Sequence, residues 1–389
     1  MNIVSHRTTQ RVVVCAILSL ILGCSTAVQR NVSAESEWLY PLDTRGLRFW
    51  DESDTDIQNY NLADEFNFLL ANKPKDEPVN YLALSGGGVN GAFSAGILNA
   101  WSDKGTKPEF DIVTGVSTGA IVSVFAFLGS DFDNDLKHYY TQTTLDEMFK
   151  RQSLFKLISS TSIVDVAGFE KKVRNAITPE LMAKLADQRG KGKILVIATT
   201  NLDNEKMALW DIGRIAQVGT SEAQTLIQDI VIASSSIPGF FPAKLISLPH
   251  RGGSYDELHV DGGVSRQVFL IPQWVHDRKQ QSQRQQNIYV IRNGAFNPKF
   301  KETENGISSV SIRSLSTLLR RQGIADVEYI YHYSKLNQFN FQLAHIDADF
   351  DDKGLDPFSL EYMNEVYNYG HRTKQEELLW QSKPPSIQP

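Results

Sequence analysis

The sequence has few cysteines, no excess of positive charge and no long apolar run. Each of these shortages argues against one structural or functional class. Only Cys15 and Cys24 occur among the 389 residues, so disulfides do not hold this fold together. Lys and Arg number 39 against 45 for Asp and Glu, and the formal net charge of −6 argues against nucleic acid as a partner. The apolar run from Val12 to Leu22 is shorter than the roughly 20 residues that a membrane-spanning helix needs. The remaining composition is typical of a globular protein.

Residues 1–23 are typical of a bacterial export signal. His6, Arg7 and Arg11 precede the apolar run, which ends immediately before Cys24. This ending resembles a bacterial lipoprotein signal, in which the cysteine becomes the lipidated first residue. The sequence therefore predicts a cleaved signal peptide, lipidation of Cys24, and a place in the bacterial cell envelope on a membrane-inserted lipid anchor. An ordinary signal peptide that is cut nearby is the alternative.

Residues 24–79 are mostly polar and are predicted to form a tether and a lead-in segment. From residue 80 onward, apolar runs alternate with helical periodicity. Strands are predicted at 81–84, 110–113, 193–199, 287–292 and 339–346, a hairpin turn at 203–204, and helices at 92–103, 120–128, 131–155, 166–187, 222–233, 307–334 and 358–381. This alternation predicts one α/β domain over residues 80–380, with a mostly parallel sheet.

A serine lies in a Gly-bounded turn between a predicted strand and a predicted helix. Residues 115–119 read Gly-Val-Ser-Thr-Gly, with Ser117 at the centre. This placement is the one that a nucleophile elbow requires, because glycines allow a sharp turn that exposes the hydroxyl near a helix N-terminus. A helix N-cap without chemistry is the alternative.

A second Gly-rich turn, Ser85 to Phe93, also joins a strand to a helix. Consecutive glycines can direct several backbone N–H groups into one concavity that binds an anion. The loop lacks the Gly-Lys-Ser/Thr ending of a nucleotide-binding P-loop. Gly88 and Ser117 are 29 positions apart, about the length of one βαβ unit, so both turns are predicted at the carboxyl ends of neighbouring strands. The amides of Gly87 and Gly88 would then face the same carbonyl as Ser117.

The best candidate for the base that activates Ser117 is Asp261. None of the eight histidines follows a buried strand in a Gly-flanked turn, whereas Val260-Asp261-Gly262-Gly263 delivers a carboxylate to a tight turn. A carboxylate close to the serine and partly removed from water can accept its proton. An Asp-Gly turn without chemistry is the alternative.

Four motifs in order resemble the patatin-like phospholipase family. They are the Gly-rich loop 85–93, the serine turn 115–119, the segment 236–242 (Ser-Ile-Pro-Gly-Phe-Phe-Pro) and the turn 261–263. The resemblance covers about 81–263 and weakens over the C-terminal third. Many relatives carry a basic residue where Asn90 stands and an aspartate where Ser85 stands, so the head-group preference stays open.

The resemblance implies a three-layer α/β/α fold with a central, mostly parallel sheet. It also implies a serine lipid acyl hydrolase that acts on phospholipids or other acyl-ester lipids through an acyl-enzyme. Carried onto this chain, the roles fall on a Ser117/Asp261 dyad and an oxyanion hole at Gly86, Gly87 and Gly88, with neither a metal nor a cofactor. Pro238 and the two phenylalanines that follow it would form a wall of the acyl pocket, or else pack as ordinary core.

Two other functional hypotheses remain. One is an α/β-hydrolase triad of Ser117, a later Asp and a later His such as His332 or His345. The other is an envelope protein that binds lipid without turnover. The acidic stretch 347–354 does not match a calcium loop, because its Gly is at the eighth position and no Glu closes it.

Overall fold

The structure is a computed structural model that describes residues 30–52, 62–142, 150–151, 164–270, 284–300, 302–375 and 379–387. The predicted signal peptide and Cys24 lie outside these residues. The same holds for parts of the predicted helices 131–155 and 358–381. Within the described ranges, no helix is both long enough and apolar enough to cross a membrane.

A nine-stranded sheet forms the centre of the fold. Seven of its strands follow the order β1-β7-β6-β3-β2-β10-β11, and the hairpin β8-β9 joins through β6. Their bounds are β1 Arg48–Trp50, β2 Val79–Leu84, β3 Ile112–Val116, β6 Ile194–Asn201, β7 Lys206–Asp211, β8 Lys244–His250, β9 Gly253–Asp261, β10 Gln286–Arg292 and β11 Asn340–His345. The five strands from β6 to β11 in this order are parallel, whereas β1, β7, β8 and β9 pair antiparallel. A separate two-stranded sheet joins β4 (Lys150–Arg151) and β5 (Val164–Asp165).

Strand β6 carries two partners in succession along one edge. Its first half pairs with β3, so that Val116 lies opposite Ala198, and its last residues pair with β9, so that Asp261 lies opposite Thr199. Its other edge is occupied by β7. The end of β9 therefore lies directly beyond the end of β3.

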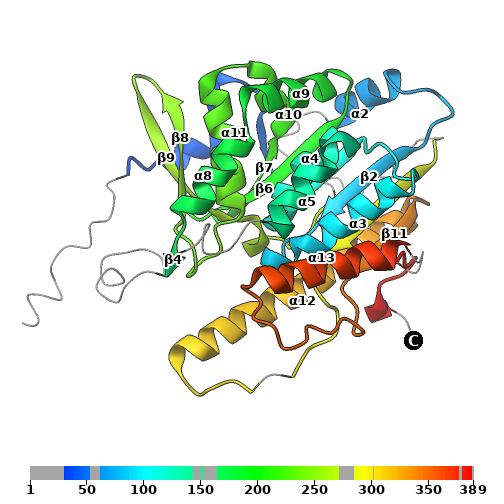
Figure 1. Cartoon of the computed structure of the whole chain (residues 1–389). Coiled ribbons are helices and arrows are strands. Elements are labelled where there is room, and N and C mark those ends of the chain that lie inside the picture. The colour runs from blue at the N-terminus through cyan, green and yellow to red at the C-terminus, as the bar shows by residue number, and fades with distance from the viewer. Residues whose placement is uncertain are drawn as a thin grey trace, which may run out of the picture.

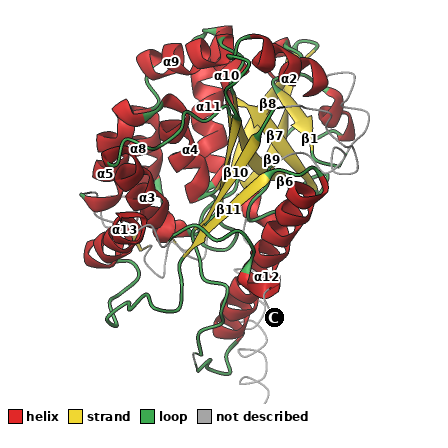
Figure 2. Cartoon of the chain, turned by 90° about the vertical axis from the view of Figure 1, so that its right-hand side faces the viewer, coloured by secondary structure: helices red, strands yellow, loops and turns green. Residues whose placement is uncertain are grey.

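Helices cover both faces of the sheet. Figure 2 shows α3, α4, α5, α8, α11 and α13 on one side of the strands and α12 on the other. The helices are α2 Leu62–Ala71, α3 Gly91–Asp103, α4 Thr118–Leu128, α5 Asp133–Thr141, α8 Ala167–Ala176, α9 Pro179–Gly190, α10 Ile212–Val218, α11 Ser221–Ser234, α12 Ile307–Leu336 and α13 Leu360–Gln375. Short 3₁₀ turns are η1 Ala34–Trp38, η2 Pro41–Asp43, η4 Gly88–Asn90, η5 Ser130–Phe132, η6 Gly262–Val264 and η8 Pro385–Ile387. The N-terminal half of α12 projects beyond the rest of the described chain (Figure 1).

The side-chain pattern of β2 explains this three-layer arrangement. Leu82 and Leu84 belong to the apolar core on the α3/α4 side, while Tyr81 and Ala83 belong to the core under α12. Successive side chains of a strand point to opposite faces, so a strand with both faces covered is continuously apolar. The predicted α/β class and mostly parallel sheet are confirmed.

The predicted lead-in contributes to this sheet, which corrects the domain start at residue 80. Strand β1 pairs with β7, and the guanidinium of Arg48 forms a buried ion pair with Glu257 at 2.6 Å. The three-residue strand around Phe49 was too short for sequence periodicity to identify it. The fold therefore begins before Asn80.

Two other predictions need correction, and one hairpin was missed. The helix predicted over 131–155 ends at Thr141 in α5, and its Lys150–Arg151 segment is strand β4. The helix predicted over 166–187 is two helices, because Thr178 caps a new helix whose first residue is Pro179. The β8-β9 hairpin that leads to Asp261 was not predicted.

Candidate active site

Ser117 occupies a strained turn at the end of β3. Its backbone dihedrals are φ 56° and ψ −126°, which residues other than glycine rarely adopt. It stands at the N-cap position of α4, and its backbone N–H donates to Ser234 Oγ at 2.9 Å. The predicted strand-turn-helix context of the serine is confirmed.

The two glycines that flank this turn allow very close packing. A Cβ on Gly119 would lie 2.4 Å from the carbonyl oxygen of Leu84, and one on Gly115 would lie 2.5 Å from the carbonyl oxygen of Gly119. No real Cβ tolerates such contacts. The start of α4 is thereby held against the end of β2, which brings Ser117 beside the Gly-rich loop.

The Gly-rich loop presents two amides without an acceptor. Within the described chain, no hydrogen-bond acceptor contacts the N–H groups of Gly87 and Gly88, and both residues line the same cavity as Ser117. By contrast, the N–H of Gly86 donates to the carbonyl of Gln267 at 2.9 Å. Gly86 was one of three glycines predicted to form the oxyanion hole. Its amide instead holds the loop in place, which leaves the amides of Gly87 and Gly88 for an oxyanion.

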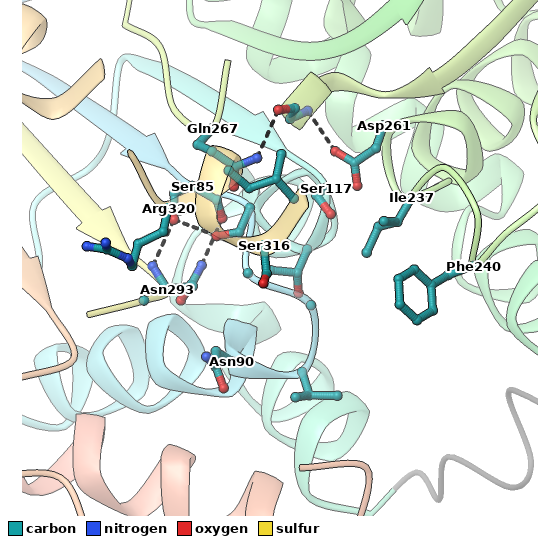
Figure 3. A pocket seen from close by; sticks show the side chains of 18 of the residues that line it. Ser85, Asn90, Ser117, Ile237, Phe240, Asp261, Gln267, Asn293, Ser316 and Arg320 are labelled. Carbon is teal, nitrogen blue, oxygen red and sulfur yellow. Dashed lines mark hydrogen bonds between the residues drawn. The ribbon is translucent and has the colours of Figure 1, made fainter. Parts of the chain in front are cut away.

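Asp261 ends β9 and faces Ser117 (Figure 3). Its backbone N–H donates to the carbonyl of Ser236 at 3.0 Å, and its Oδ1 accepts from the N–H of Gly263 at 2.7 Å. The Ser117 hydroxyl lies close enough to the carboxyl group to favour its ionised form, which by itself lowers the pKa of Asp261. The structure therefore brings the two residues of the predicted dyad together.

Burial changes the acidity of Asp261. The residue is 5% exposed, and removal of its carboxylate from water raises the pKa to about 7. The Ser117 hydroxyl and the hydrogen bond from the Gly263 amide favour the ionised form and limit the rise in pKa. A carboxyl group with this pKa exchanges its proton near neutral pH, which suits a general base.

Gln267 and Asn293, which sequence reasoning did not identify, fix the Gly-rich loop from two sides. Gln267 accepts from Gly86 through its carbonyl and donates through its side-chain amide to the carbonyl of Gly263 at 2.9 Å. Asn293 donates through its backbone N–H to Ser85 Oγ at 2.8 Å and through its side chain to the Ser85 carbonyl at 2.9 Å. No local motif distinguishes either residue from an ordinary surface amide.

The site opens into a large cavity of about 1740 Å³. An apolar wall lies on the Asp261 side of Ser117, where Figure 3 shows Ile237 and Phe240. Other apolar residues that line the cavity are Ile121, Phe169, Pro238 and Phe241. The segment 236–242 thus borders the cavity, as expected if it forms a wall of the acyl pocket.

No described histidine lines this cavity. His332 is exposed on α12 and contacts Tyr331, while His345 is buried against Phe296 with its Nδ1 beside the carbonyl of Ile346. The triad hypothesis therefore finds no imidazole next to Ser117 in this part of the chain. Among the described residues, no group of three or more His, Cys, Asp or Glu side chains could hold a metal ion.

These features define an α/β protein with a strained serine at a strand-to-helix turn, a buried aspartate and a Gly-rich loop. Residues 82–272 match the model of the family described as patatin-like phospholipase. The chain is 26% identical over 211 residues to patatin-like protein 2 of Oryza sativa, in both the indica and the japonica subspecies. This match covers 49% of the chain and 51% of the relative, so the chain spans about half the length of the relatives it matches.

Three solved structures are also similar. VipD from Legionella pneumophila has 12% identity and a TM-score of 0.38, with 77% of this chain and 67% of that chain covered. Human GIVD cytosolic phospholipase A2 has 11% identity and a TM-score of 0.37, with 81% and 64% covered. ExoU from Pseudomonas aeruginosa, in complex with SpcU, has 14% identity and a TM-score of 0.35, with 77% and 52% covered. The family match over residues 82–272 establishes that this chain contains a patatin-like phospholipase domain.

Replacing Asp261 by Asn is expected to stabilise the protein above pH 7. The unfolded chain ionises near pH 4 and the folded chain near pH 7, so the contribution of this carboxyl to stability is complete below about pH 4 and is lost as the pH rises through 7. The difference in unfolding free energy between variant and wild type should grow across this window, to at most about 4 kcal/mol. Urea unfolding at pH 4.5, 6 and 8 measures it.

Asp131→Asn is the matched control, because Asp131 is exposed in η5. Its difference from wild type should stay within about 0.5 kcal/mol at every pH. An Asp261→Asn difference that is independent of pH would contradict the raised pKa.

Proposed function

We propose that this chain hydrolyses acyl esters of lipids, with Ser117 as nucleophile and Asp261 as general base. The observation that carries the proposal is the meeting of three features in one cavity: the strained serine, the buried carboxyl that faces it, and the two amides without acceptors in the Gly-rich loop. A protein that only binds lipid would not need these three features in combination. The family match supports the same chemistry.

The first half of the reaction transfers the acyl group to the enzyme. Ser117 Oγ attacks the ester carbonyl carbon while its proton passes to the Asp261 carboxylate. The carbonyl oxygen becomes an oxyanion, which the N–H groups of Gly87 and Gly88 stabilise, each by roughly 3 kcal/mol. The adduct then collapses: the bond to the alcohol oxygen breaks, and Asp261 returns the proton to the departing alcohol.

The second half releases the acid. A water molecule attacks the acyl-serine carbonyl and gives a proton to Asp261. The second tetrahedral adduct is stabilised by the same amides and breaks at Ser117 Oγ, which recovers the proton. Serine and carboxylate are thereby restored, so one aspartate serves as base and then as acid in each half.

The surroundings of the site favour a lipid as the source of the acyl group. The apolar wall beside Ser117 can accept an acyl chain. The protruding N-terminal half of α12, which borders the same cavity, exposes Ile307, Val310, Ile312 and Leu318. Of these, Ile312 lines the cavity, and exposed apolar groups beside a cavity are typical of a surface that meets lipid.

Ser117→Ala is expected to lower turnover of a short-chain p-nitrophenyl ester and of a phospholipid by at least about a thousandfold. Asp261→Asn is expected to lower it by about a hundredfold or more, because the base is lost while the fold remains. A fluorophosphonate should label Ser117 in the wild type, which peptide mass spectrometry locates.

Ser130→Ala and Asp131→Asn are the matched controls, since both residues are exposed beyond the far end of α4. Both should keep wild-type turnover. If Asp261→Asn is fully active and a variant of His332 or His345 is inactive, the triad hypothesis is correct and the dyad is wrong. If the wild type hydrolyses no ester and is not labelled, the hypothesis of a protein that binds lipid without turnover is favoured.

The same proposal extends to the location of the chain. The N-terminal sequence supports export and attachment to a membrane of the bacterial envelope through acyl chains on Cys24. Cys24→Ser is expected to abolish incorporation of a labelled fatty acid and to move the protein from the membrane fraction to the soluble fraction. Label that persists in this variant would exclude the anchor.

A further inference from the structure

A group of arginines borders the cavity from outside the segment that matches the family. Arg292 ends β10, and Arg313 and Arg320 lie on α12; all three line the same cavity as Ser117. The Gly-rich loop, by contrast, has no charged side chain between Ser85 and Phe93. Positive charge near the candidate site is therefore supplied by the C-terminal part of the chain.

None of these three guanidinium groups has a carboxylate within ion-pair distance among the described residues. Instead they donate to backbone carbonyls: Arg313 to Lys299 at 3.1 Å, Arg320 to Phe296 at 2.9 Å, and Arg292 to Gly294 at 2.9 Å and to Arg320 at 3.2 Å. Such bonds orient the guanidinium groups but do not neutralise their charge. Each arginine has five N–H donors, so donors remain for a ligand.

Arg292 shows that this positive charge is energetically unfavourable without a ligand. Arg292 is 6% exposed. Its burial, together with the nearby charge of Arg320, lowers its pKa to about 10. The nearby charge of Asp326 favours the charged form of Arg292 and limits this drop, so the buried charge is only partly compensated. An anion bound in the cavity would offset this penalty.

The acidic groups of the cavity do not balance the arginines. Asp261 and Asp356 are the carboxyls among its lining residues, and Asp261 is only partly ionised at neutral pH because its pKa is about 7. Lys299 also lines the cavity and is paired with Asp352 at 2.5 Å. The cavity therefore has a net positive charge in a chain whose formal net charge is −6.

The labelled arginine and the labelled apolar residues of the cavity lie on different sides of Ser117, although α12 also lines the cavity with Ile312, Leu315 and Leu319. In Figure 3, Arg320 and Asn293 lie on one side of Ser117, and Ile237 and Phe240 lie on the other. An ester whose carbonyl is at Ser117 can therefore place its acyl chain on the apolar side and its alcohol part on the basic side. Guanidinium groups recognise phosphate oxygens through charge-assisted hydrogen bonds.

We propose that Arg313 and Arg320, with Arg292 bonded to the Arg320 carbonyl, bind a phosphate group on the alcohol part of the substrate. The chain then prefers acyl esters that carry phosphate to neutral glycerides with the same acyl chains. This inference rests on the proposed hydrolase function and adds a specificity site from outside the family-matched segment.

The test compares two soluble esters with identical acyl chains, dihexanoylphosphatidylglycerol and dihexanoylglycerol. The ratio of their kcat/KM values is expected to fall about tenfold in Arg320→Gln and in Arg313→Gln, and less in Arg320→Lys. Arg321→Gln is the matched control, because Arg321 is exposed on the same helix and does not line the cavity. An equal loss on both esters, or an unchanged ratio, would overturn the proposal.

A binding measurement separates this proposal from the proposed catalysis. Calorimetry with the Ser117→Ala protein as host should show dihexanoylphosphatidylglycerol binding about tenfold more weakly once Arg320→Gln is added. This loss is expected even if the wild type hydrolyses neither ester, a result that would contradict the hydrolase function alone. Inorganic phosphate is the probe for a free-anion site. If it changes hydrolysis of the neutral ester without competing against the phosphate-bearing ester, the head-group site is overturned.

Discussion

The candidate site depends on the way in which β6 shares one of its edges. Because β7 occupies the other edge, β3 and β9 must both pair along the same side of β6, one after the other. Val116 opposite Ala198 is followed at once by Asp261 opposite Thr199. Two residues that are 144 positions apart in the chain, Ser117 and Asp261, are thereby brought face to face by backbone pairing. Side-chain attraction between them is not needed to assemble the pair.

Both members of the pair are held in conditions that cost free energy. Ser117 has a backbone conformation that non-glycine residues avoid, and Asp261 is a carboxyl group removed from water. The end of α11 stabilises both, since Ser234 accepts from the Ser117 amide and the Ser236 carbonyl accepts from the Asp261 amide. Ser234 at the end of α11 and Ser236 just beyond it thus hold the backbone of both residues in place.

The local parts of this site could be predicted from sequence, and the long-range parts could not. Ser117 and Asp261 stand in Gly-flanked turns whose meaning depends only on a few neighbours. The β8-β9 hairpin, the pairing of β1 with β7, and the cross-links made by Gln267 were not predictable, because they depend on partners far along the chain. The engagement of the Gly86 amide was missed for the same reason: its acceptor is a carbonyl 181 positions away. The arginines of α12 were not identified as site residues either, because only the fold brings this helix to the cavity.

The central claim is that the buried Asp261 accepts the proton of Ser117, and the pH dependence of kcat/KM for a neutral ester tests it most directly. We predict a rate that rises with pH through a single ionisation near 7 and then stays constant, because only the carboxylate form is active. In Asp261→Asn the residual rate should lack this ionisation. A rise through pH 7 that survives in Asp261→Asn would assign the base to another residue and contradict the account.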